Sequence, residues 1–173
     1  GYLSNVITDF FGDNYKGIDI VYSFEKEPLG TGGAISQALA ETKTEEVLIL
    51  NGDTMFQVDL NDFYKSHKEN KADFSMALKP LENFERYGVV QLNPANQVIG
   101  FEEKQFQESG IINGGVYILN KSKLISYSFP KKYSFEREFL ESKFRDLHFN
   151  GFVSEGYFLD IGIPDDYDQA QKD

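Results

Sequence analysis

Cysteine and tryptophan are both absent from this chain of 173 residues. Without cysteine the chain can have neither a disulfide framework nor a thiolate metal site. No apolar run is long enough to span a bilayer and no signal peptide is visible, so we expect a soluble, cytoplasmic protein. Basic residues are in the minority, with 17 Lys and Arg against 28 Asp and Glu and a formal net charge of −11. This acidity argues against nucleic acid or an anionic membrane as a partner.

Aromatic side chains, by contrast, are plentiful: the chain has 16 Phe and 10 Tyr within a hydrophobic fraction of 40%. This composition excludes a disordered chain. A chain of this length can bury a sizeable core, and we expect residues 1–173 to form a single domain.

Apolar periodicity predicts helices that alternate with strands along the chain. Helices are expected over residues 3–11, 32–41, 59–70, 121–127, 134–144 and 165–172. In the third of these, Asp59 is the expected cap and Leu60, Phe63 and Tyr64 are expected to face inward. Strands are expected over residues 18–23, 46–53, 73–79, 113–120, 148–154 and 157–162, with a hairpin of 88–92 and 98–103. The pattern indicates an α/β fold, in which helices flank a mixed, mostly parallel sheet with a small antiparallel extension.

Two aspartates lie at the ends of apolar strands: Asp53 closes LILNGD and Asp160 closes YFLD. If both converge on one cleft, they could hold Mg²⁺, which takes a couple of protein oxygens and fills its shell with water and phosphate. The alternative is that each residue caps a turn through an Asx hydrogen bond. Spacing alone favours the cap, because aspartate is common at strand ends.

The stretch EKEPLGTGG places Glu25 just before Gly30, Gly32 and Gly33. Glycine tolerates positive φ and lets a flat ligand lie against the backbone. The Glu25 carboxylate could accept both N1–H and N2–H of guanine, a pair of donors that uracil and thymine lack. The alternative is a plain strand-to-helix turn with a solvated acid, since neither the Walker A lysine nor GxGxxG spacing is present.

Two further stretches carry polar groups at strand ends. Lys104 could present a point charge to a phosphate, and the neighbouring Glu103 could accept sugar hydroxyls. Asn113 and Gly114 open a strand where a ligand could lie against the backbone. A solvated strand end and a β-bulge are the respective alternatives. The two histidines lack partners at ligand spacing and are interpreted as structural.

Six segments follow one another along the chain: EKEPLGTGGAI, LILNGD, RYGVVQL, FEEK, NGGVYIL and FLDIGIPDDY. In these segments and in their order, the chain resembles the sugar-phosphate nucleotidyltransferases, or nucleotide-sugar pyrophosphorylases. The resemblance spans nearly the whole chain. The EPLGTGGA and NGDT forms are most similar to the guanylyltransferase branch that acts on D-glycero-D-manno-heptose 1-phosphate. It implies a Rossmann-like nucleotidyltransferase fold and Mg²⁺-dependent transfer from GTP to a sugar 1-phosphate, giving a GDP-sugar for surface glycan synthesis and pyrophosphate.

The resemblance also implies a role for individual residues. The implied catalytic residues are Asp53, Lys104 and Asp160, of which the two aspartates would hold Mg²⁺ and the lysine would bind the sugar 1-phosphate. The implied nucleotide-binding residues are Glu25, Leu29, Gly30, Thr31, Gly32, Gly33 and Gly52. The implied sugar-binding residues are Tyr87, Gly88, Glu103, Asn113 and Gly114.

The sequence departs from the family pattern at its start. The family opens with a strand and a GGxGTRL-type loop that wraps the triphosphate, and neither is present in these residues, so the chain is interpreted as N-terminally incomplete. We therefore expect poor turnover, because loop amides do much of the work on the triphosphate. We also expect an unpaired sheet edge, which favours association and makes a homo-oligomer possible.

Three other functions remain open at this point. The first is a mannose 1-phosphate guanylyltransferase, and the second is a thymidylyl or uridylyl relative. The third is an inactive nucleotide-sugar-binding or regulatory module. A GT-A glycosyltransferase, whose fold is related, is disfavoured because Thr54 and Met55 follow Asp53 where a DxD metal motif is expected.

Overall fold

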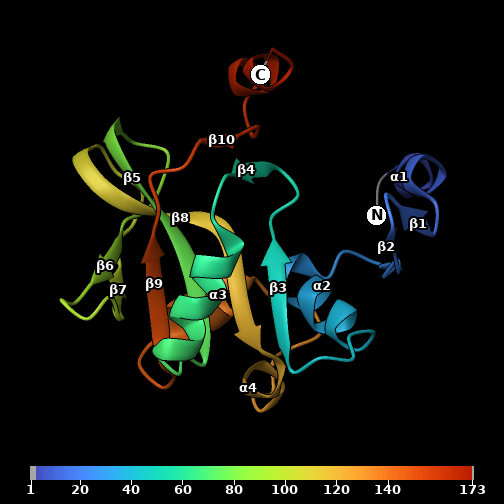
Figure 1. The fold of residues 1–173 in the computed structure, drawn as a ribbon, viewed down its shortest axis with the longest axis horizontal. Coiled ribbons are helices and arrows are strands. Elements are labelled where there is room, and N and C mark those ends of the chain that lie inside the picture. The colour runs from blue at the N-terminus through green and yellow to red at the C-terminus, as the bar shows by residue number, and fades with distance from the viewer. Residues whose placement is uncertain (1–2, 173) are drawn as a thin grey trace.

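The computed structural model describes residues 3–172. Its centre is a sheet in the order β3–β8–β5–β9 (Figure 1), made of Glu46–Leu50 (β3), Gln107–Asn120 (β8), Phe74–Phe84 (β5) and Phe149–Val153 (β9). β8 pairs antiparallel with both β3 and β5, and β5 pairs parallel with β9. Three of the four strands therefore run in one direction while two of the three pairings are antiparallel, which confirms the expected mixed sheet.

The two central strands bury both of their faces because apolar side chains occupy successive positions. In β5, Phe74, Met76 and Leu78 belong to the larger of two core clusters, whereas Ala77 belongs to the smaller one. β8 alternates in the same way, with Tyr117 in the larger cluster. Side chains along a strand point to opposite faces in turn, so one sheet separates the two clusters.

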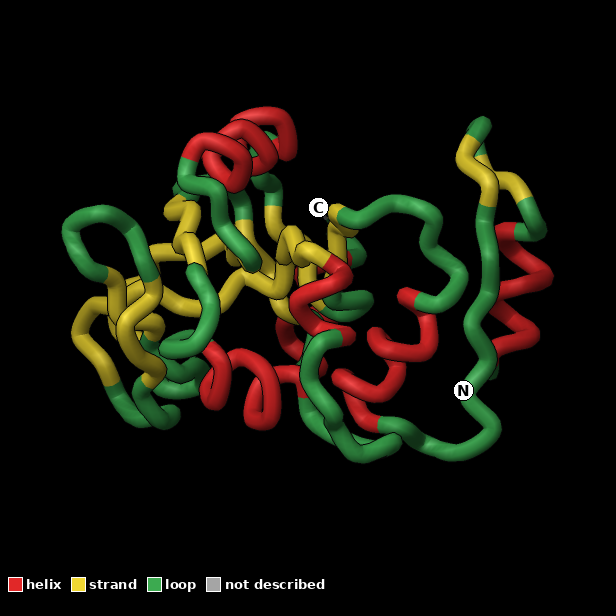
Figure 2. Tube along the Cα trace, turned by 90° about the horizontal axis from the view of Figure 1, so that it is seen from below, coloured by secondary structure: helices red, strands yellow, loops and turns green. Residues whose placement is uncertain are grey.

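Helices cover both faces of this sheet (Figure 2). The helical elements are α2 (Gly30–Leu39), α3 (Leu60–Glu69), α4 (Lys121–Ile125), the π-helix η1 (Phe135–Leu140) and α5 (Glu141–Lys143). The helix expected over 134–144 is thus present, but its first part is a π-helix. The apolar stripe expected there is buried as predicted, and it consists of Phe135, Phe139, Leu140 and Phe144.

Helix α3 begins as expected but turns a different face inward. The Asp59 carboxylate accepts hydrogen bonds from the backbone N–H groups of residues 61 and 62 at 2.9 and 3.0 Å. Phe63 is buried, whereas Leu60 and Tyr64, expected to face inward, are 47% and 46% exposed. The inner position one turn on belongs to His67, whose Nδ1 lies 2.8 Å from Ser75 Oγ. The structural role expected for this histidine is confirmed.

Short elements complete the body of the molecule. β4 (Thr54–Phe56) pairs antiparallel with β10 (Phe158–Asp160). β6 (Val90–Leu92) and β7 (Val98–Phe101) form the expected antiparallel hairpin. The last element is helix α6 (Pro164–Ala170). None of the described helices is both long and apolar enough to cross a membrane.

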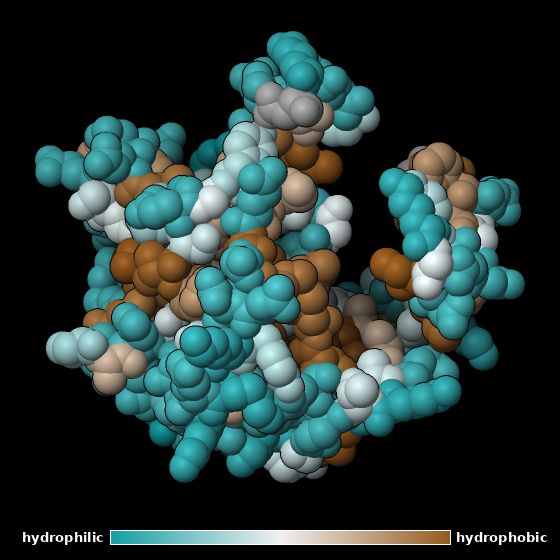
Figure 3. All heavy atoms as spheres, viewed as in Figure 1, coloured by the Kyte–Doolittle hydropathy of each residue, from teal (hydrophilic) through white to brown (hydrophobic). Residues whose placement is uncertain are grey.

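An N-terminal arm of α1 (Ser4–Phe11), β1 (Asn14–Tyr15) and β2 (Ile18–Asp19) stands apart from this body (Figure 1). The strand expected over 18–23 is reduced to the two residues of β2, because beyond them the chain runs beside no other described strand. Helix α1 buries no residue, and Phe10 is 70% exposed. Figure 3 shows apolar atoms on the side of the arm that faces the body.

The sheet has an exposed apolar edge at β3. Within residues 3–172, β3 pairs only with β8. Leu48 and Leu50 on this strand are both exposed. The unpaired edge that the sequence led us to expect is therefore present in the described part of the chain.

Candidate active site

A cavity of about 640 Å³ opens where the β6–β7 hairpin, β8, β10 and the η1–α5 segment meet. These elements come from distant parts of the chain, and the fold brings their polar residues to one wall. Six residues singled out from the sequence line the cavity: Tyr87, Gly88, Glu103, Lys104, Asn113 and Asp160. The sequence-derived sugar and phosphate residues thus lie together, apart from those described below.

The charges around the cavity are of two kinds. Five of the lining residues are carboxylates, namely Glu102, Glu103, Glu136, Glu141 and Asp160. Two cations, Lys104 and Arg145, share the same lining. An ionised carboxylate only accepts hydrogen bonds and so suits hydroxyl donors, whereas a lysine or arginine suits a phosphate. The lining therefore fits a ligand that has several hydroxyls and one phosphate.

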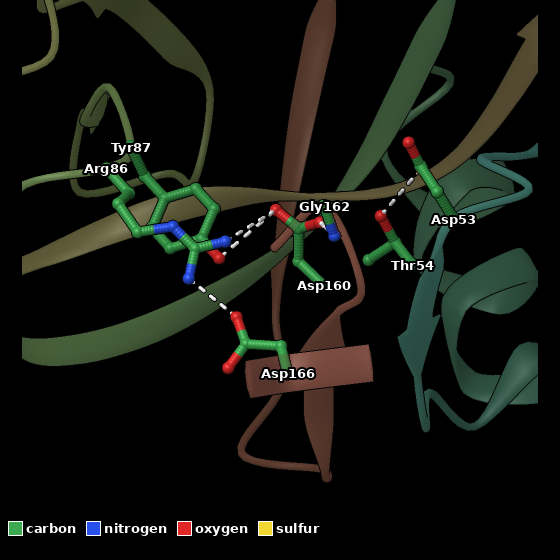
Figure 4. A network of polar contacts seen from close by, with 7 residues as sticks. All are labelled: Asp53, Thr54, Arg86, Tyr87, Asp160, Gly162 and Asp166. Carbon is green, nitrogen blue, oxygen red and sulfur yellow. Dashed lines mark hydrogen bonds and ion pairs between the residues drawn. The ribbon is translucent and has the colours of Figure 1, made fainter. Parts of the chain in front are cut away.

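Asp160 is held from three sides (Figure 4). The Tyr87 hydroxyl donates to its Oδ2 at 3.2 Å, and Arg86 Nη2 lies 3.7 Å from the same oxygen. Burial, together with the nearby Asp160 charge, raises the pKa of Tyr87 to about 12, so its hydroxyl remains a donor. The Gly162 N–H donates to Oδ1 at 2.9 Å, which is the Asx turn given above as the alternative. The second guanidinium nitrogen, Arg86 Nη1, binds Asp166 at 2.6 Å.

Strand pairing brings the backbone of Asp53 next to Ile161, although Asp53 is not among the residues that line the cavity. In the β4–β10 ladder Asp160 lies opposite Thr54, and the N–H of Ile161 donates to the backbone oxygen of Asp53 at 3.0 Å. The Asp53 side chain is exposed and accepts a 3.3 Å hydrogen bond from the Thr54 hydroxyl. Figure 4 shows Asp160 at the end of β10 and Asp53 just before β4.

The donor set fits magnesium better than a metal that needs many protein ligands. Among residues 3–172, no group of three His, Cys, Asp or Glu side chains could hold a metal ion. Asp53 and Asp160 are therefore the two candidate carboxylates at this edge. Mg²⁺ is commonly bound through one or two carboxylates, with water and substrate phosphates completing the octahedron.

The glycine-rich segment differs from the expected open loop, because it forms the first turn of α2. Of its three glycines only Gly30 has a positive φ, of +72°. A Cβ on Gly32 would lie 2.1 Å from the Tyr133 ring, and one on Gly33 would lie 2.4 Å from the Lys131 carbonyl oxygen. The expectation that all three glycines take a positive φ is thus wrong, whereas their contact with a flat ligand stays a prediction. Gly32 and Gly33 allow close packing against residues 131–133.

We expect Gly32→Ala to lower the free energy of unfolding by about 1–3 kcal/mol, because the added methyl group forces the Tyr133 ring to move. Gly52→Ala is the matched control: position 52 has no heavy atom within 4 Å of a built Cβ and no positive φ. Thermal or urea unfolding of both variants measures the difference. Equal stability of the two would contradict the packing role of Gly32.

The remaining nucleotide-binding candidates are Glu25, Leu29 and Thr31, on and beside this turn, and Gly52, which follows β3. Glu25 Oε2 accepts a hydrogen bond from the Leu29 N–H at 2.8 Å, so the acid braces the turn. Leu29 is buried and, with Gly33, lines a second cavity of about 380 Å³ beside Tyr133. Gly52 is exposed, next to Asp53. Contact between these residues and a nucleotide stays a prediction.

One sugar-binding candidate lies away from the main cavity. A Cβ on Gly114 would meet the Phe56 ring at 2.3 Å, which places this residue against the smaller core cluster. Its neighbour Asn113 lines the cavity. The Cα of Gly114 thus points its vacant side-chain position toward Phe56, because successive strand residues face opposite sides. Contact between its backbone and the sugar stays a prediction.

Sequence reasoning missed several residues of the site. They are Asn51, Glu136, Glu141 and Arg145, which line the cavity, and Arg86, which binds Asp160. Glu136, Glu141 and Arg145 occupy positions that read as the solvated face of an amphipathic helix. The π-helical turn that carries Glu136 has no signature in the apolar pattern, so no local signal could have found it.

Comparison with known proteins adds the family to this geometry. The model of the nucleotidyl transferase family matches residues 2–173. The chain belongs to this family. A D-glycero-alpha-D-manno-heptose 1-phosphate guanylyltransferase from Aneurinibacillus thermoaerophilus is 51% identical over 173 residues, which are 100% of this chain and 75% of that protein. The protein of the same name from Campylobacter jejuni is 44% identical over 166 residues, which are 96% of this chain and 72% of that protein.

Solved structures agree with this assignment. Aligned with the crystal structure of HddC from Yersinia pseudotuberculosis complexed with GMP-PN, this nucleotidyl transferase gives a TM-score of 0.86 and 34% identity. The alignment covers 99% of this chain and 74% of that one. A structure from Bacillus anthracis, 16% identical with a TM-score of 0.73, shares the fold alone. The expected family and fold are therefore confirmed, and the protein is an enzyme of the transferase type.

Proposed function

We propose that this nucleotidyl transferase transfers a guanylyl group from GTP to D-glycero-α-D-manno-heptose 1-phosphate, which yields a GDP-sugar and pyrophosphate. The observation that supports this reaction is the cavity lined by Lys104, by Asp160 and by further carboxylates that can accept hydrogen bonds from hydroxyls. The choice of sugar and nucleotide follows the names of the two relatives described above.

On the sugar side, the chain offers one cation and several fixed polar groups. The Lys104 ammonium would bind the 1-phosphate, and Glu103 would accept sugar hydroxyls. The orientation of Asn113 is set by two contacts: its amide donates to the Tyr117 hydroxyl at 2.8 Å, and its oxygen accepts from the Gly115 N–H at 3.0 Å. Such preset groups reduce the entropy lost when the substrate is positioned.

On the nucleotide side, Glu25 would accept hydrogen bonds from guanine while it braces the Leu29 turn. Each carboxylate oxygen has two lone pairs, so the 2.8 Å contact from the Leu29 N–H does not exhaust Oε2. Asp53 and Asp160 would hold Mg²⁺, which would neutralise charge on the triphosphate.

The reaction requires no protein nucleophile. A phosphate oxygen of the sugar 1-phosphate attacks the α-phosphorus of GTP in line, while the bond from that phosphorus to the bridging oxygen of the β-phosphate breaks. Pyrophosphate leaves with the bond electrons. Lys104 would offset the repulsion between the two phosphates, and the cavity wall would hold the sugar so that its phosphate is aligned.

We expect GTP with Mg²⁺ to protect the chain from thermal unfolding, and UTP, dTTP or ATP to protect it less. A ligand present at about 100 times its dissociation constant adds about 2.7 kcal/mol of stability, which raises the melting temperature by several degrees. Addition of EDTA should remove most of the shift. Greater protection by dTTP or UTP would contradict the proposed role of Glu25, and no protection by any nucleotide would count against the proposed function.

The same preparation separates an enzyme from an inactive binding module. An enzyme releases pyrophosphate when GTP, Mg²⁺ and heptose 1-phosphate are combined. A binding module is stabilised by the GDP-sugar but releases no pyrophosphate.

A further inference from the structure

Glu136 lines the cavity and also contacts the first turn of α2. It lies in the first turn of η1, is half-buried, and lines the cavity with Asn113 and Tyr117. Its Oε2 accepts a 2.8 Å hydrogen bond from the hydroxyl of Thr31, a residue of the glycine-rich turn. The sugar cavity and the proposed nucleotide-binding turn therefore share this carboxylate.

The Glu136 carboxylate is held in one orientation. Besides Thr31, the Ser134 hydroxyl donates to the same Oε2 at 2.9 Å. The Thr31 hydroxyl is itself fixed, because it accepts from the Phe135 N–H at 2.8 Å. Both hydrogen bonds that the described chain makes to this carboxylate fall on Oε2. Oε1 is thus left to accept from a ligand.

The segment that carries Glu136 is also fixed to the turn by its backbone. The Gly32 N–H donates to the Tyr133 oxygen and the Tyr133 N–H donates to the Leu29 oxygen, both at 3.0 Å. A movement of this turn on nucleotide binding would be passed to residues 133–136 through these contacts. Glu136 is in this way placed on the wall by the same element that would bind the base.

We propose that Glu136 is a specificity-determining residue for the sugar, whose Oε1 accepts a hydrogen bond from one ring or side-chain hydroxyl of the sugar 1-phosphate. Thr31 is a positioning residue that orients this carboxylate. The assignment rests on the proposed function, since it takes a sugar 1-phosphate as the occupant of the cavity. A carboxylate discriminates well against a sugar that lacks the hydroxyl, because a half-buried charge is then left without its donor.

The test is calorimetric titration of the chain with heptose 1-phosphate and with a set of its monodeoxy analogues, each in the presence of Mg²⁺. We expect Glu136→Gln to weaken binding of the parent sugar roughly tenfold or more, as for loss of a charged hydrogen bond, and to leave GTP affinity within about twofold. One monodeoxy analogue should bind the unsubstituted chain more weakly than the parent sugar does. This difference in affinity should largely disappear in Glu136→Gln. Thr31→Val should reproduce part of the parent-sugar effect.

Glu138→Gln is the matched control, because Glu138 is two residues away, is exposed, and caps the Ser134 N–H at 2.7 Å without lining the cavity. It should bind all the sugars as the unsubstituted chain does. If Glu136→Gln weakens every analogue and the parent sugar equally, Glu136 is only structural and the proposal is overturned. If the unsubstituted chain binds no sugar 1-phosphate, the proposed function is wrong, and the role of Glu136 that rests on it is wrong too.

Discussion

Asp160→Asn is expected to abolish the Mg²⁺ dependence of nucleotide binding and to lower the rate of pyrophosphate release about 100- to 1000-fold, as does loss of one group aimed at the reacting charge. The amide keeps the size of the side chain: its one oxygen can still accept from the Gly162 N–H, and its NH₂ group, in place of Oδ2, can donate to the Tyr87 hydroxyl. What it loses is the negative charge that a hard cation requires. Asp53→Asn should act in the same direction. Calorimetry with GTP, with and without Mg²⁺, measures the change.

The Arg86 contact provides the control for this prediction. Arg86 binds both Asp160 and Asp166, and the contact to Asp166 is the shorter, at 2.6 Å against 3.7 Å. Asp166→Asn removes the negative charge from the shorter contact but leaves both candidate metal ligands in place. It should therefore keep its response to Mg²⁺. If Asp160→Asn and Asp53→Asn keep theirs too, these residues are turn caps and the metal assignment fails.

Lys104→Met should weaken the binding of the sugar 1-phosphate about 10- to 100-fold and raise its KM, with little effect on GTP. Lys104 lies on the cavity wall among carboxylates, where an acidic chain with a net charge of −11 has few cations to offer a phosphate. A charge-assisted hydrogen bond to phosphate is about twice as strong as a neutral one. Lys104→Arg should recover only part of the affinity, because the guanidinium has a different shape.

Lys65→Met is the control for Lys104, since Lys65 is an exposed lysine whose ion pair is with Glu69 on the outer face of α3. It should leave sugar binding unchanged. The measurement is a titration with heptose 1-phosphate and, separately, with orthophosphate. Orthophosphate should lose affinity in step with the sugar phosphate in Lys104→Met. Unaltered binding of both ligands would show that Lys104 is a solvated strand end, the alternative given by the charge pattern.

Local patterns in the sequence predicted the elements that depend on neighbouring residues. The Asp59 cap, the buried stripe of η1 and α5, and the β6–β7 hairpin follow from spacing and turn chemistry, and the structure contains all three. These features needed no knowledge of distant contacts.

Long-range contacts decided what the sequence could not predict. The strand expected over residues 18–23 has no described neighbour to pair with, so its apolar residues Ile18 and Val21 are exposed. Position 32 requires glycine because the Tyr133 ring, about a hundred residues away in the chain, packs against it. Glu136 likewise gains its place through Thr31, 105 residues away. Such partners leave no trace in the periodicity of their own segment.

The short β4–β10 ladder has a consequence for the order in which the molecule can assemble. Its three residue pairs join segments that lie about a hundred residues apart in the chain. Closing a loop of that length costs entropy, and within the ladder only the three residue pairs offset this cost. The ladder therefore depends on β5 and β8, which must already be packed between its two ends. We therefore expect Asp53 and Asp160 to come together late in folding, and the proposed Mg²⁺ binding would then distinguish the finished fold from a collapsed core.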